Sequence, residues 1–491
     1  MKTVHSEETK KCIKGVLIAT LLILCCVFFC HQIFLKRVEQ YRYSPNKREA
    51  AKQRASIVID LNRNGVTTSK EGKHIHFDFD SNGFAESTGW INPQDGFLVV
   101  DLNNNGEIDN GRELFGNHTP LKDGTLATNG FEALKEWDSN GDGVISELDE
   151  GWSQLKIWRD KPDKPPYGKT DEGELLSLDE IGLKSINLNY NELNFTDLSK
   201  NKHTQRGKVE WKDGGSSSAV NVWFKVNSTN AYSLEVIYVS KEVGSLPNIK
   251  AFGNVADLHT SMQKNEALFE KVQTFLVSDF SKQRKLLNDL VYEWTGSIDV
   301  DPHSRDYSPN AHVMDARQLV ALENLMGRPY INIHDGDVEQ SNPRPDAAAI
   351  LIDEYYKFAN YFHAALLAEN NYWTEFRGMV LHDYYAHGKP FYDNKQFIQT
   401  LKTSIENKNL DQARVIVFTA KYLGNYDSLL RGRVENAFAE VSNFGSLHKE
   451  AIISLKNDIK NSAKLTVEDI RLPKQTPTKG DDGLHNSQLL R

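Results

Sequence analysis

Cysteine is confined to the first thirty residues of this 491-residue chain, where Cys12, Cys25, Cys26 and Cys30 lie. The rest of the chain therefore has no disulfide framework, no cysteine-ligated zinc site and no cysteine nucleophile. We interpret Cys25, Cys26 and Cys30 as apolar residues of a membrane segment, with lipid attachment as the alternative. The sequence also lacks a P-loop, a Gly-x-Ser-x-Gly motif and a zincin motif, so none of these catalytic motifs assigns an enzyme activity.

An excess of positive charge is also missing, and the formal net charge of −9 does not suggest nucleic-acid binding. Negative charge is concentrated in residues 101–180, which hold 19 acidic against 8 basic residues, a local charge of −11. The simpler interpretation is a solvated acidic surface. The sharper one is a segment whose self-repulsion is relieved when cations bind.

Residues 15–35 form a hydrophobic run of 21 residues without a formal charge. As a helix this run is about 31 Å long, close to the hydrocarbon thickness of a bilayer, about 30 Å. Bulky residues such as Phe28 and Phe34 continue to its end, where a cleaved signal peptide would have small residues. The sequence predicts an uncleaved single-pass membrane anchor, preceded by a flank (1–14) and followed by a basic linker (36–55).

The orientation of this anchor stays open. Four lysines precede the hydrophobic run and seven lysines or arginines follow it within residues 36–55, which alone puts the body of the chain in the cytoplasm. Weak oxygen-rich ion sites, however, fill where calcium is plentiful, outside the cytoplasm. Because of the loops described next, we predict a periplasmic or extracellular body.

Two stretches have the spacing of EF-hand-like calcium loops, with oxygen-bearing side chains at positions 1, 3 and 5, Gly at position 6 and Ile at position 8. Alternate residues can then direct oxygens to one ion, and Gly permits the sharp turn. The ligands predicted in the first loop are Asp101, Asn103, Asn105, the Glu107 carbonyl, Asp109 and Glu113. Those predicted in the second loop are Asp138, Asn140, Asp142, the Val144 carbonyl and Asp149.

The closing carboxylates depart from the bidentate Glu that is usual at position 12. Arg112 occupies that position in the first loop, so we expect Glu113 to close the loop one residue later. In the second loop the shorter Asp149 stands there. Both departures predict weak structural sites, with dissociation constants of about 10⁻⁴ to 10⁻³ M. We also expect Ile108 and Ile145 to pair between two facing loops.

Three further acidic stretches are open between ion loops and ordinary turns, because Asn, Asp and Gly also favour turns without metal. Asp60–Asn64 has only the opening half of the pattern, and Asp78–Glu86 has its Glu at position 9. In Asp160–Glu174, three prolines disrupt the spacing.

The hydrophobic patterning predicts an α+β fold. We expect a strand-rich module with the EF-hand-like loops at 56–190, a β-rich segment at 191–250, a mostly α-helical region at 251–465 and a disordered tail at 466–491. Apolar residues at helical spacing occur on both sides of the second loop, which predicts a helix–loop–helix.

The run from His76 to Trp90, the segment from Asp95 to Asp101, and Glu113-Leu-Phe-Gly116 resemble the calcium-binding module of bacterial RTX, or hemolysin-type, exported proteins. The resemblance extends over about residues 57–330. It implies calcium-dependent ordering of an exported protein at the two loops. The glycine-rich nonapeptide repeats of RTX toxins are absent and the N-terminal anchor is unusual for that group, so toxin activity is not carried over.

The leading hypothesis is therefore a membrane-anchored protein that binds Ca²⁺, is ordered by it, and contacts an unknown protein partner through its helical region. Some iron-regulated RTX-type proteins that resemble this module cleave themselves at an Asp-Pro bond. The alternative is accordingly a calcium-dependent effector or a self-processing protein cleaved at Asp301-Pro302, the chain's one such bond. Because that bond follows the loops instead of preceding them, an enzyme activity is the weaker hypothesis.

Overall fold

The computed structural model describes residues 53–72, 75–161, 168–308, 311–333 and 339–371, together with five single residues between 403 and 418. Within these residues no helix has both the length and the apolar character needed to cross a bilayer. The anchor predicted at 15–35 and the tail predicted at 466–491 lie outside the described residues, and so does the predicted helical region beyond residue 371, apart from single positions.

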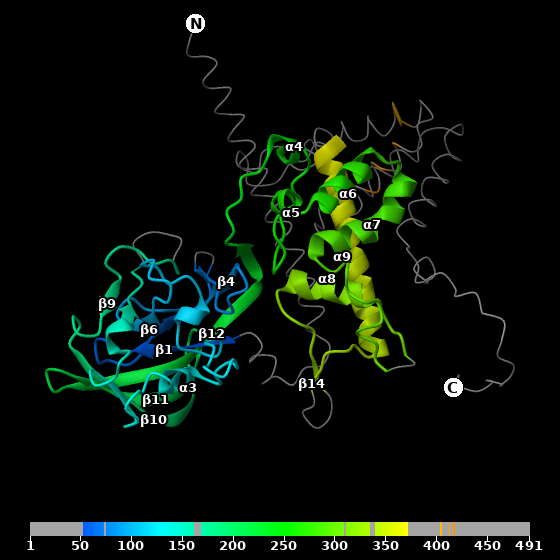
Figure 1. Cartoon of the computed structure of the whole chain (residues 1–491). Coiled ribbons are helices and arrows are strands. Elements are labelled where there is room, and N and C mark those ends of the chain that lie inside the picture. The colour runs from blue at the N-terminus through cyan, green and yellow to red at the C-terminus, as the bar shows by residue number, and fades with distance from the viewer. Residues whose placement is uncertain are drawn as a thin grey trace, which may run out of the picture. The chain divides into compact units, whose positions relative to one another are not determined.

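An antiparallel sheet forms the first part of the described chain, and helices follow it, which confirms the α+β class (Figure 1). Ten strands of the described residues belong to this sheet. Along its main path they are β7 (Val144–Ser146), β10 (Leu183–Thr196), β11 (Lys202–Trp211), β12 (Ser216–Ser233), β1 (Gln53–Ile59), β6 (Gly96–Val100), β8 (Leu155–Trp158) and β9 (Leu175–Ser177). Off this path, β4 (Phe84–Thr88) pairs with β12 and with β3 (His76–Phe77).

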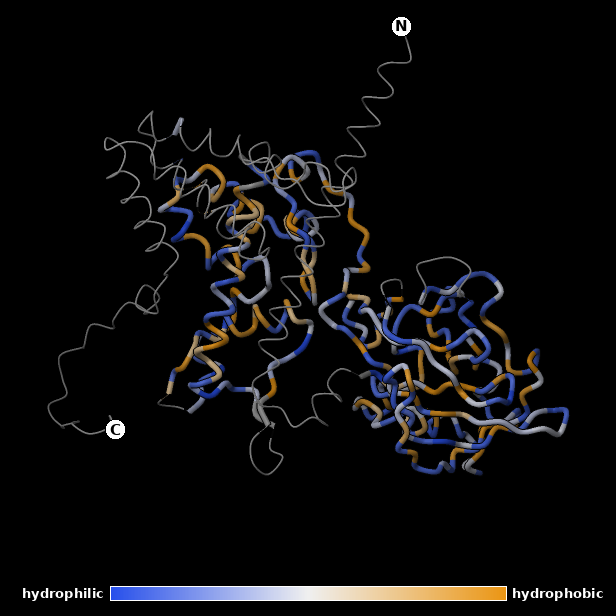
Figure 2. The backbone as a smooth tube through the Cα atoms, turned by 180° about the vertical axis from the view of Figure 1, so that it is seen from behind, coloured by the Kyte–Doolittle hydropathy of each residue, from blue (hydrophilic) through white to orange (hydrophobic). Residues whose placement is uncertain are grey.

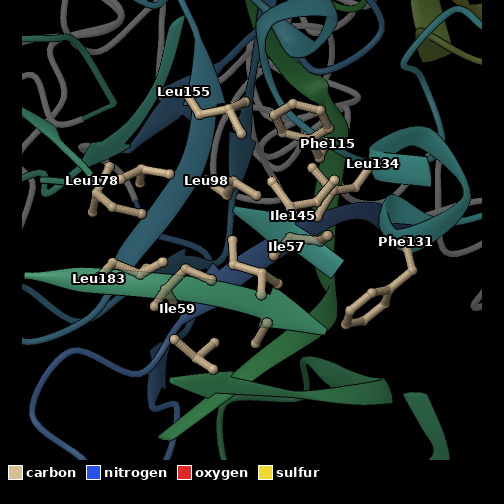
Figure 3. Packing of buried hydrophobic residues seen from close by; sticks show 14 of the residues in the cluster. Ile57, Ile59, Leu98, Phe115, Phe131, Leu134, Ile145, Leu155, Leu178 and Leu183 are labelled. Atoms are coloured by element: carbon tan, nitrogen blue, oxygen red, sulfur yellow. The ribbon is translucent and has the colours of Figure 1, made fainter. Parts of the chain in front are cut away.

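Both faces of the central strands are buried. Successive residues of a strand point to opposite faces of the sheet, so neighbouring residues belong to different hydrophobic clusters. Ile57 and Ile59 of β1 enter one hydrophobic cluster, whereas Val58 enters another. Helix α3 (Gly130–Lys135) contributes Phe131 and Leu134 to the first cluster (Figure 3). The second cluster is rich in aromatic side chains that include Phe77, Phe79, Trp90 and Trp158. A sheet buried on both faces explains why β6 is apolar throughout, without polar alternation.

In the β-rich part, hydrophilic and hydrophobic stretches of the tube alternate (Figure 2). Two short antiparallel pairs complete the described strands. One joins β2 (Thr68–Ser69) to β5 (Trp90–Ile91), and the other joins β13 (Asn332–Ile333) to β14 (Glu339–Gln340).

Helices dominate the described residues from 241 to 371, most of which fall in the helical region predicted from residue 251. They are α4 (Lys241–Gly244), α5 (Leu258–Lys264), α6 (Glu266–Val277), α7 (Phe280–Thr295), α8 (Ala316–Met326) and α9 (Pro345–Asn371). Asp279 and Asp315 accept backbone N–H groups at the starts of α7 and α8, and Gly296 and Gly327 end them in the left-handed conformation.

The helix predicted after the second loop is wrong. The chain there forms strand β7, then the 3-10 turn η2 (Trp152–Gln154), then strand β8. Ile145 pairs with Ile186 of β10, so the loop leads into the sheet and not into a helix. Leu148, one of the apolar residues at helical spacing after the loop, is 73% exposed. Pairing with the sheet overrides the local helical spacing of Trp152 and Leu155, both of which are buried in its core.

Candidate metal centres

Four acidic loops share one backbone conformation. In each, the residues at positions 4 and 6 have positive φ angles: Arg63 and Gly65, Ser81 and Gly83, Asn104 and Gly106, Gly141 and Gly143. The aspartate at position 1 then accepts the backbone N–H groups of positions 5 and 6. This geometry folds the chain around the first carboxylate, as an ion-binding loop requires.

The Asp101 loop brings its predicted ligands together. Asp101 accepts the amides of Asn105 and Gly106 at 3.2 and 2.9 Å, and Asn105 accepts the amide of Glu107 at 2.8 Å. The side-chain amides of Asn103 and Asn105 both donate to one oxygen of Asp109, at 2.8 and 2.9 Å. The side chains at positions 3, 5 and 9 are thus connected to one another, and the side chain at position 1 holds the backbone of positions 5 and 6.

In the Asp138 loop, backbone amides donate to the side chains at positions 1, 3 and 5 as in the Asp101 loop. Asp138 accepts the amide of Gly143 at 2.9 Å, Asn140 accepts that of Asp142 at 2.9 Å, and Asp142 accepts that of Val144 at 2.9 Å. Most of this loop is exposed, so a bound ion would keep access to water. An exposed, incompletely charged loop fits weak binding better than the site of a high-affinity sensor.

The closing carboxylates occupy equivalent places although their sequence positions differ. Glu113 accepts the amide of Leu102 at 3.0 Å and that of Asp109 at 2.7 Å. Asp149 accepts the amides of Ser139 and Ser146, each at 2.9 Å. In both loops, therefore, one carboxylate accepts the N–H groups of positions 2 and 9. The sequence predicts Glu113 and Asp149 as the closing ligands of an ion, and the structure places each carboxylate beside the backbone of its own loop.

The two loops do not face each other, so the expected pairing of Ile108 with Ile145 is wrong. Ile145 pairs with Ile186 and packs in the cluster of Ile57, whereas Ile108 packs in the aromatic cluster on the other face of the sheet. Ile108 donates its backbone N–H to Thr170 at 2.9 Å. The sheet separates the two isoleucines because each packs on the face from which its own loop emerges.

Sequence reasoning missed the closing residue of the Asp60 loop, which is Asp95. One oxygen of Asp95 accepts the backbone N–H and the side-chain hydroxyl of Thr67, at 2.9 and 3.2 Å, and its other oxygen is buried without a hydrogen-bond partner. Burial raises the pKa of Asp95 to about 6, and the neighbouring Asp60 adds to this effect. The loop that has only an opening half in the sequence is thus completed from a distant segment.

Asp160 and Glu174 also come together, although the prolines between them lie in residues 162–167, which are not described. Glu174 accepts the amides of Lys161 and Asp171 at 2.6 and 3.0 Å. Asp160 accepts the indole N–H of Trp90 at 2.6 Å, and burial raises the pKa of Asp160 to about 6. In the loop that begins at Asp160, the backbone N–H of position 2 (Lys161) therefore donates to a closing carboxylate (Glu174), as in the other loops.

The Asp78 loop also holds buried carboxylates. Asp78 and Glu86 are 3% and 0% exposed, and Asp80 is partly buried. Burial raises the pKa of Glu86 to about 8, against the opposing effect of Arg54, and raises that of Asp78 to about 6. Burial likewise raises the pKa of Glu113 above its ordinary value.

Fold and loops together define a class of protein: an antiparallel β-module whose connections are acidic, EF-hand-like loops closed by buried carboxylates. Residues 57–225 match the family model of the SPM domain, a stretch that begins within β1 and ends within β12.

A particular relative is the iron-regulated protein FrpA of Neisseria meningitidis serogroup C. It is 30% identical over 241 residues, which are 48% of this chain and 21% of FrpA. The chain is therefore a distant homologue of FrpA over that stretch and corresponds to about a fifth of its length. This homology to a bacterial iron-regulated protein confirms part of the resemblance drawn from the sequence.

Proposed function

We propose that this chain is a calcium-binding protein whose β-module is ordered by Ca²⁺ at the Asp101 and Asp138 loops. One observation carries the proposal: in both loops a single carboxylate, Glu113 or Asp149, accepts the amides of positions 2 and 9 and so closes the loop on the position 1 aspartate. The ligand atoms are all oxygens, which hard cations such as Ca²⁺ prefer.

Electrostatics favours the same ion. Residues 101–180 have a formal charge of −11, and the loops concentrate part of this charge around each opening aspartate. A divalent cation at each loop would lower that self-repulsion and stabilise the folded module. Binding would thus act on structure, as the resemblance to RTX-type proteins implies, and not on a chemical reaction.

We further propose that the module is exported and held at a membrane by residues 15–35, with its body periplasmic or extracellular. The uncharged 21-residue run supports the anchor, and the RTX-type resemblance together with the homology to FrpA supports export. The helices after residue 240 are proposed to contact a protein partner. A reporter fused at residue 60 that is active only outside the cytoplasm tests the orientation.

Calcium-induced thermal stabilisation tests the central proposal. The full chain in detergent is heated with excess chelator and with 10 mM CaCl₂, about 10 to 100 times the expected dissociation constant. Each site should then contribute about 1.4 to 2.7 kcal/mol. The double variant Asp101→Ala/Asp138→Ala should lose this increment, whereas Glu107→Ala/Glu147→Ala, which removes exposed carboxylates of the same loops, should keep it. An unchanged calcium shift in the first variant contradicts the proposal.

The alternative of self-processing is decided in the same samples by intact mass. Asp301 is exposed and lies beyond the residues that match the SPM domain. Its carboxylate accepts the amide of His303 at 3.0 Å. A calcium-dependent loss of mass that corresponds to cleavage at Asp301-Pro302 would favour the alternative, and an unchanged mass excludes it.

A further inference from the structure

Two imidazoles and one carboxylate meet in the connection between α7 and α8, beyond the residues that match the SPM domain. His303, Asp306 and His312 each offer one ligand atom, and these three atoms lie within 4.8 Å of one another. His303 Nδ1 is 3.2 Å from one oxygen of Asp306, and His312 Nδ1 is 2.6 Å from the other. The centroids of the two imidazole rings are 4.3 Å apart. Both imidazoles therefore direct the same ring nitrogen to one carboxylate.

A reversal of the chain brings His312 back to Asp306. Tyr307 donates its N–H to the carbonyl of Ala311 at 3.2 Å, and Ala311 donates its N–H to the carbonyl of Ser308 at 2.9 Å. Ser308 and Ala311 also form an isolated antiparallel bridge. Because these bonds lie directly between Asp306 and His312 in the sequence, the backbone itself holds the two residues close together.

Further hydrogen bonds fix the start of this segment. The N–H of Asp306 donates to the carbonyl of His303 at 3.2 Å, so both residues belong to one turn. Asn342, which precedes α9, donates its side-chain amide to the carbonyl of Asp306 at 2.7 Å. Ala316, the first residue of α8, donates its N–H to the carbonyl of Pro302 at 3.0 Å. The backbone that carries the three side chains is therefore held by its own bonds, as a preorganised metal site requires.

The carboxylate of Asp306 keeps its negative charge available for a cation. Its ion-pair partners among the described residues are His303 and His312. The neighbouring Arg305 pairs instead with Glu323, at 2.9 and 3.1 Å. With both imidazoles neutral, each offers a ring lone pair and the cluster carries one negative charge. The side chains of His303 and His312 are 52% and 35% exposed, so a dissolved ion can reach them.

The donor atoms select the kind of ion. Ca²⁺ takes about six to eight oxygen ligands, whereas this cluster offers two ring nitrogens and one carboxylate. Imidazole nitrogens suit Zn²⁺ and related first-row transition metals. Zinc ligands about 2.0–2.2 Å from the ion lie about 3.3–3.6 Å apart in a tetrahedron. The 3.2 Å between His303 and Asp306 is close to this spacing, and the exposed His312 reaches it by withdrawing less than about 1 Å from Asp306.

We propose that His303, Asp306 and His312 bind one zinc-type transition-metal ion, through Nδ1 of each imidazole and one carboxylate oxygen. Three protein ligands leave the fourth position of the tetrahedron to water. The ion would stabilise the connection between α7 and α8, whose described residues form turns and an isolated bridge instead of a helix or a strand. This site is independent of the proposed calcium sites, because it differs from them in residues, donor atoms and kind of ion.

The number of bound zinc ions tests the proposal. The full chain in detergent, with excess CaCl₂ to compete at oxygen-rich sites, is dialysed to equilibrium against ZnCl₂, and bound zinc per chain is counted. His303→Gln, His312→Gln and Asp306→Asn should each bind one zinc ion fewer than the wild type. Asp299→Asn removes an exposed carboxylate of the same connection outside the cluster and should bind the wild-type number. Zinc bound elsewhere contributes equally to every protein and cancels in the difference.

Cobalt supplies a readout that a loss of structure alone does not explain. Co²⁺ in place of Zn²⁺ absorbs visible light when nitrogen and oxygen ligands surround it. The wild type and Asp299→Asn should therefore show an absorption band that His303→Gln, His312→Gln and Asp306→Asn lack.

Circular dichroism accompanies both measurements. All variants should remain folded, because His303 and His312 are exposed; if one variant unfolds, the other two decide. A folded ligand variant that keeps the wild-type number of zinc ions overturns the inference, and so does a wild type without the cobalt band. The double variant Asp101→Ala/Asp138→Ala should keep the zinc number, so a failure of the calcium proposal and a failure of the zinc proposal are distinguished.

Discussion

Replacing Glu113 with Ala tests the closing carboxylate directly. Glu113 is 3% exposed and accepts two backbone amides, from Leu102 at 3.0 Å and from Asp109 at 2.7 Å. Alanine leaves both donors without this acceptor. A buried donor that loses its partner costs about 1–3 kcal/mol, so the two together cost about 2 kcal/mol if water reaches one of them. The loss should occur in chelator as well as in calcium.

In a domain of this size, 1 kcal/mol shifts the melting temperature by about 2–4 °C. Glu113→Ala should therefore melt about 4–8 °C below the wild type in chelator, and the gap should widen in calcium as the first loop loses its ion. Glu107→Ala is the matched control: its side chain is exposed, and only its carbonyl is a predicted ligand. Differential scanning calorimetry measures both. Equal melting temperatures of Glu113→Ala and the wild type in chelator would refute the argument that Glu113 closes the loop.

Three further predictions concern neighbouring features. In Gly111→Ala the new Cβ would lie 1.8 Å from the Phe79 carbonyl oxygen, so we expect a stability loss of at least about 1–3 kcal/mol and weaker calcium binding. The control is Gly72→Ala, whose Cβ would have no neighbouring atom nearer than 3.8 Å. This variant should match the stability of the wild type in urea titrations. Without calcium, the free energy of unfolding should fall as pH rises from about 4 to 8. The reason is that the folded state holds protons that the unfolded chain has released, on Glu86 (pKa about 8) and on Asp78, Asp95 and Asp160 (pKa about 6). Denaturation at constant ionic strength measures this dependence, and a stability that rises over this pH window contradicts the prediction. Asp95→Asn should raise the melting temperature in chelator at pH 8, since it removes a buried charge beside Asp60, and a lower melting temperature would argue that the Asp95 charge is already compensated.

Local features of the ion loops follow from short-range sequence rules. Asp at position 1 and Gly at position 6 lie five residues apart, so their hydrogen bonds form within one turn of chain. Strands β1 and β6 can also be predicted from the sequence, because their apolar runs are short and bounded by Asp and Gly. These features were predictable because the groups that interact are neighbours in sequence.

Long-range pairing decided what the sequence could not. The segment after Asp138 has apolar residues at helical spacing, yet Ile145 pairs with Ile186 and the chain becomes a strand. Likewise Ile108 and Ile145 hold the same loop position but pack on opposite faces of the sheet, which no local pattern records. The competing interaction in both cases is burial against a sheet whose strands come from distant segments.

The sequence by itself determined the kind of site: oxygen-rich, glycine-turned loops in a chain whose described part has no cysteine. Only the tertiary structure decided how each loop is closed. Asp95 completes the Asp60 loop from 35 residues away, and Glu86 meets Arg54 from β1, because β-strand pairing brings these segments together. A carboxylate that lies far off in sequence can be found only once the fold buries it beside the amides that it accepts.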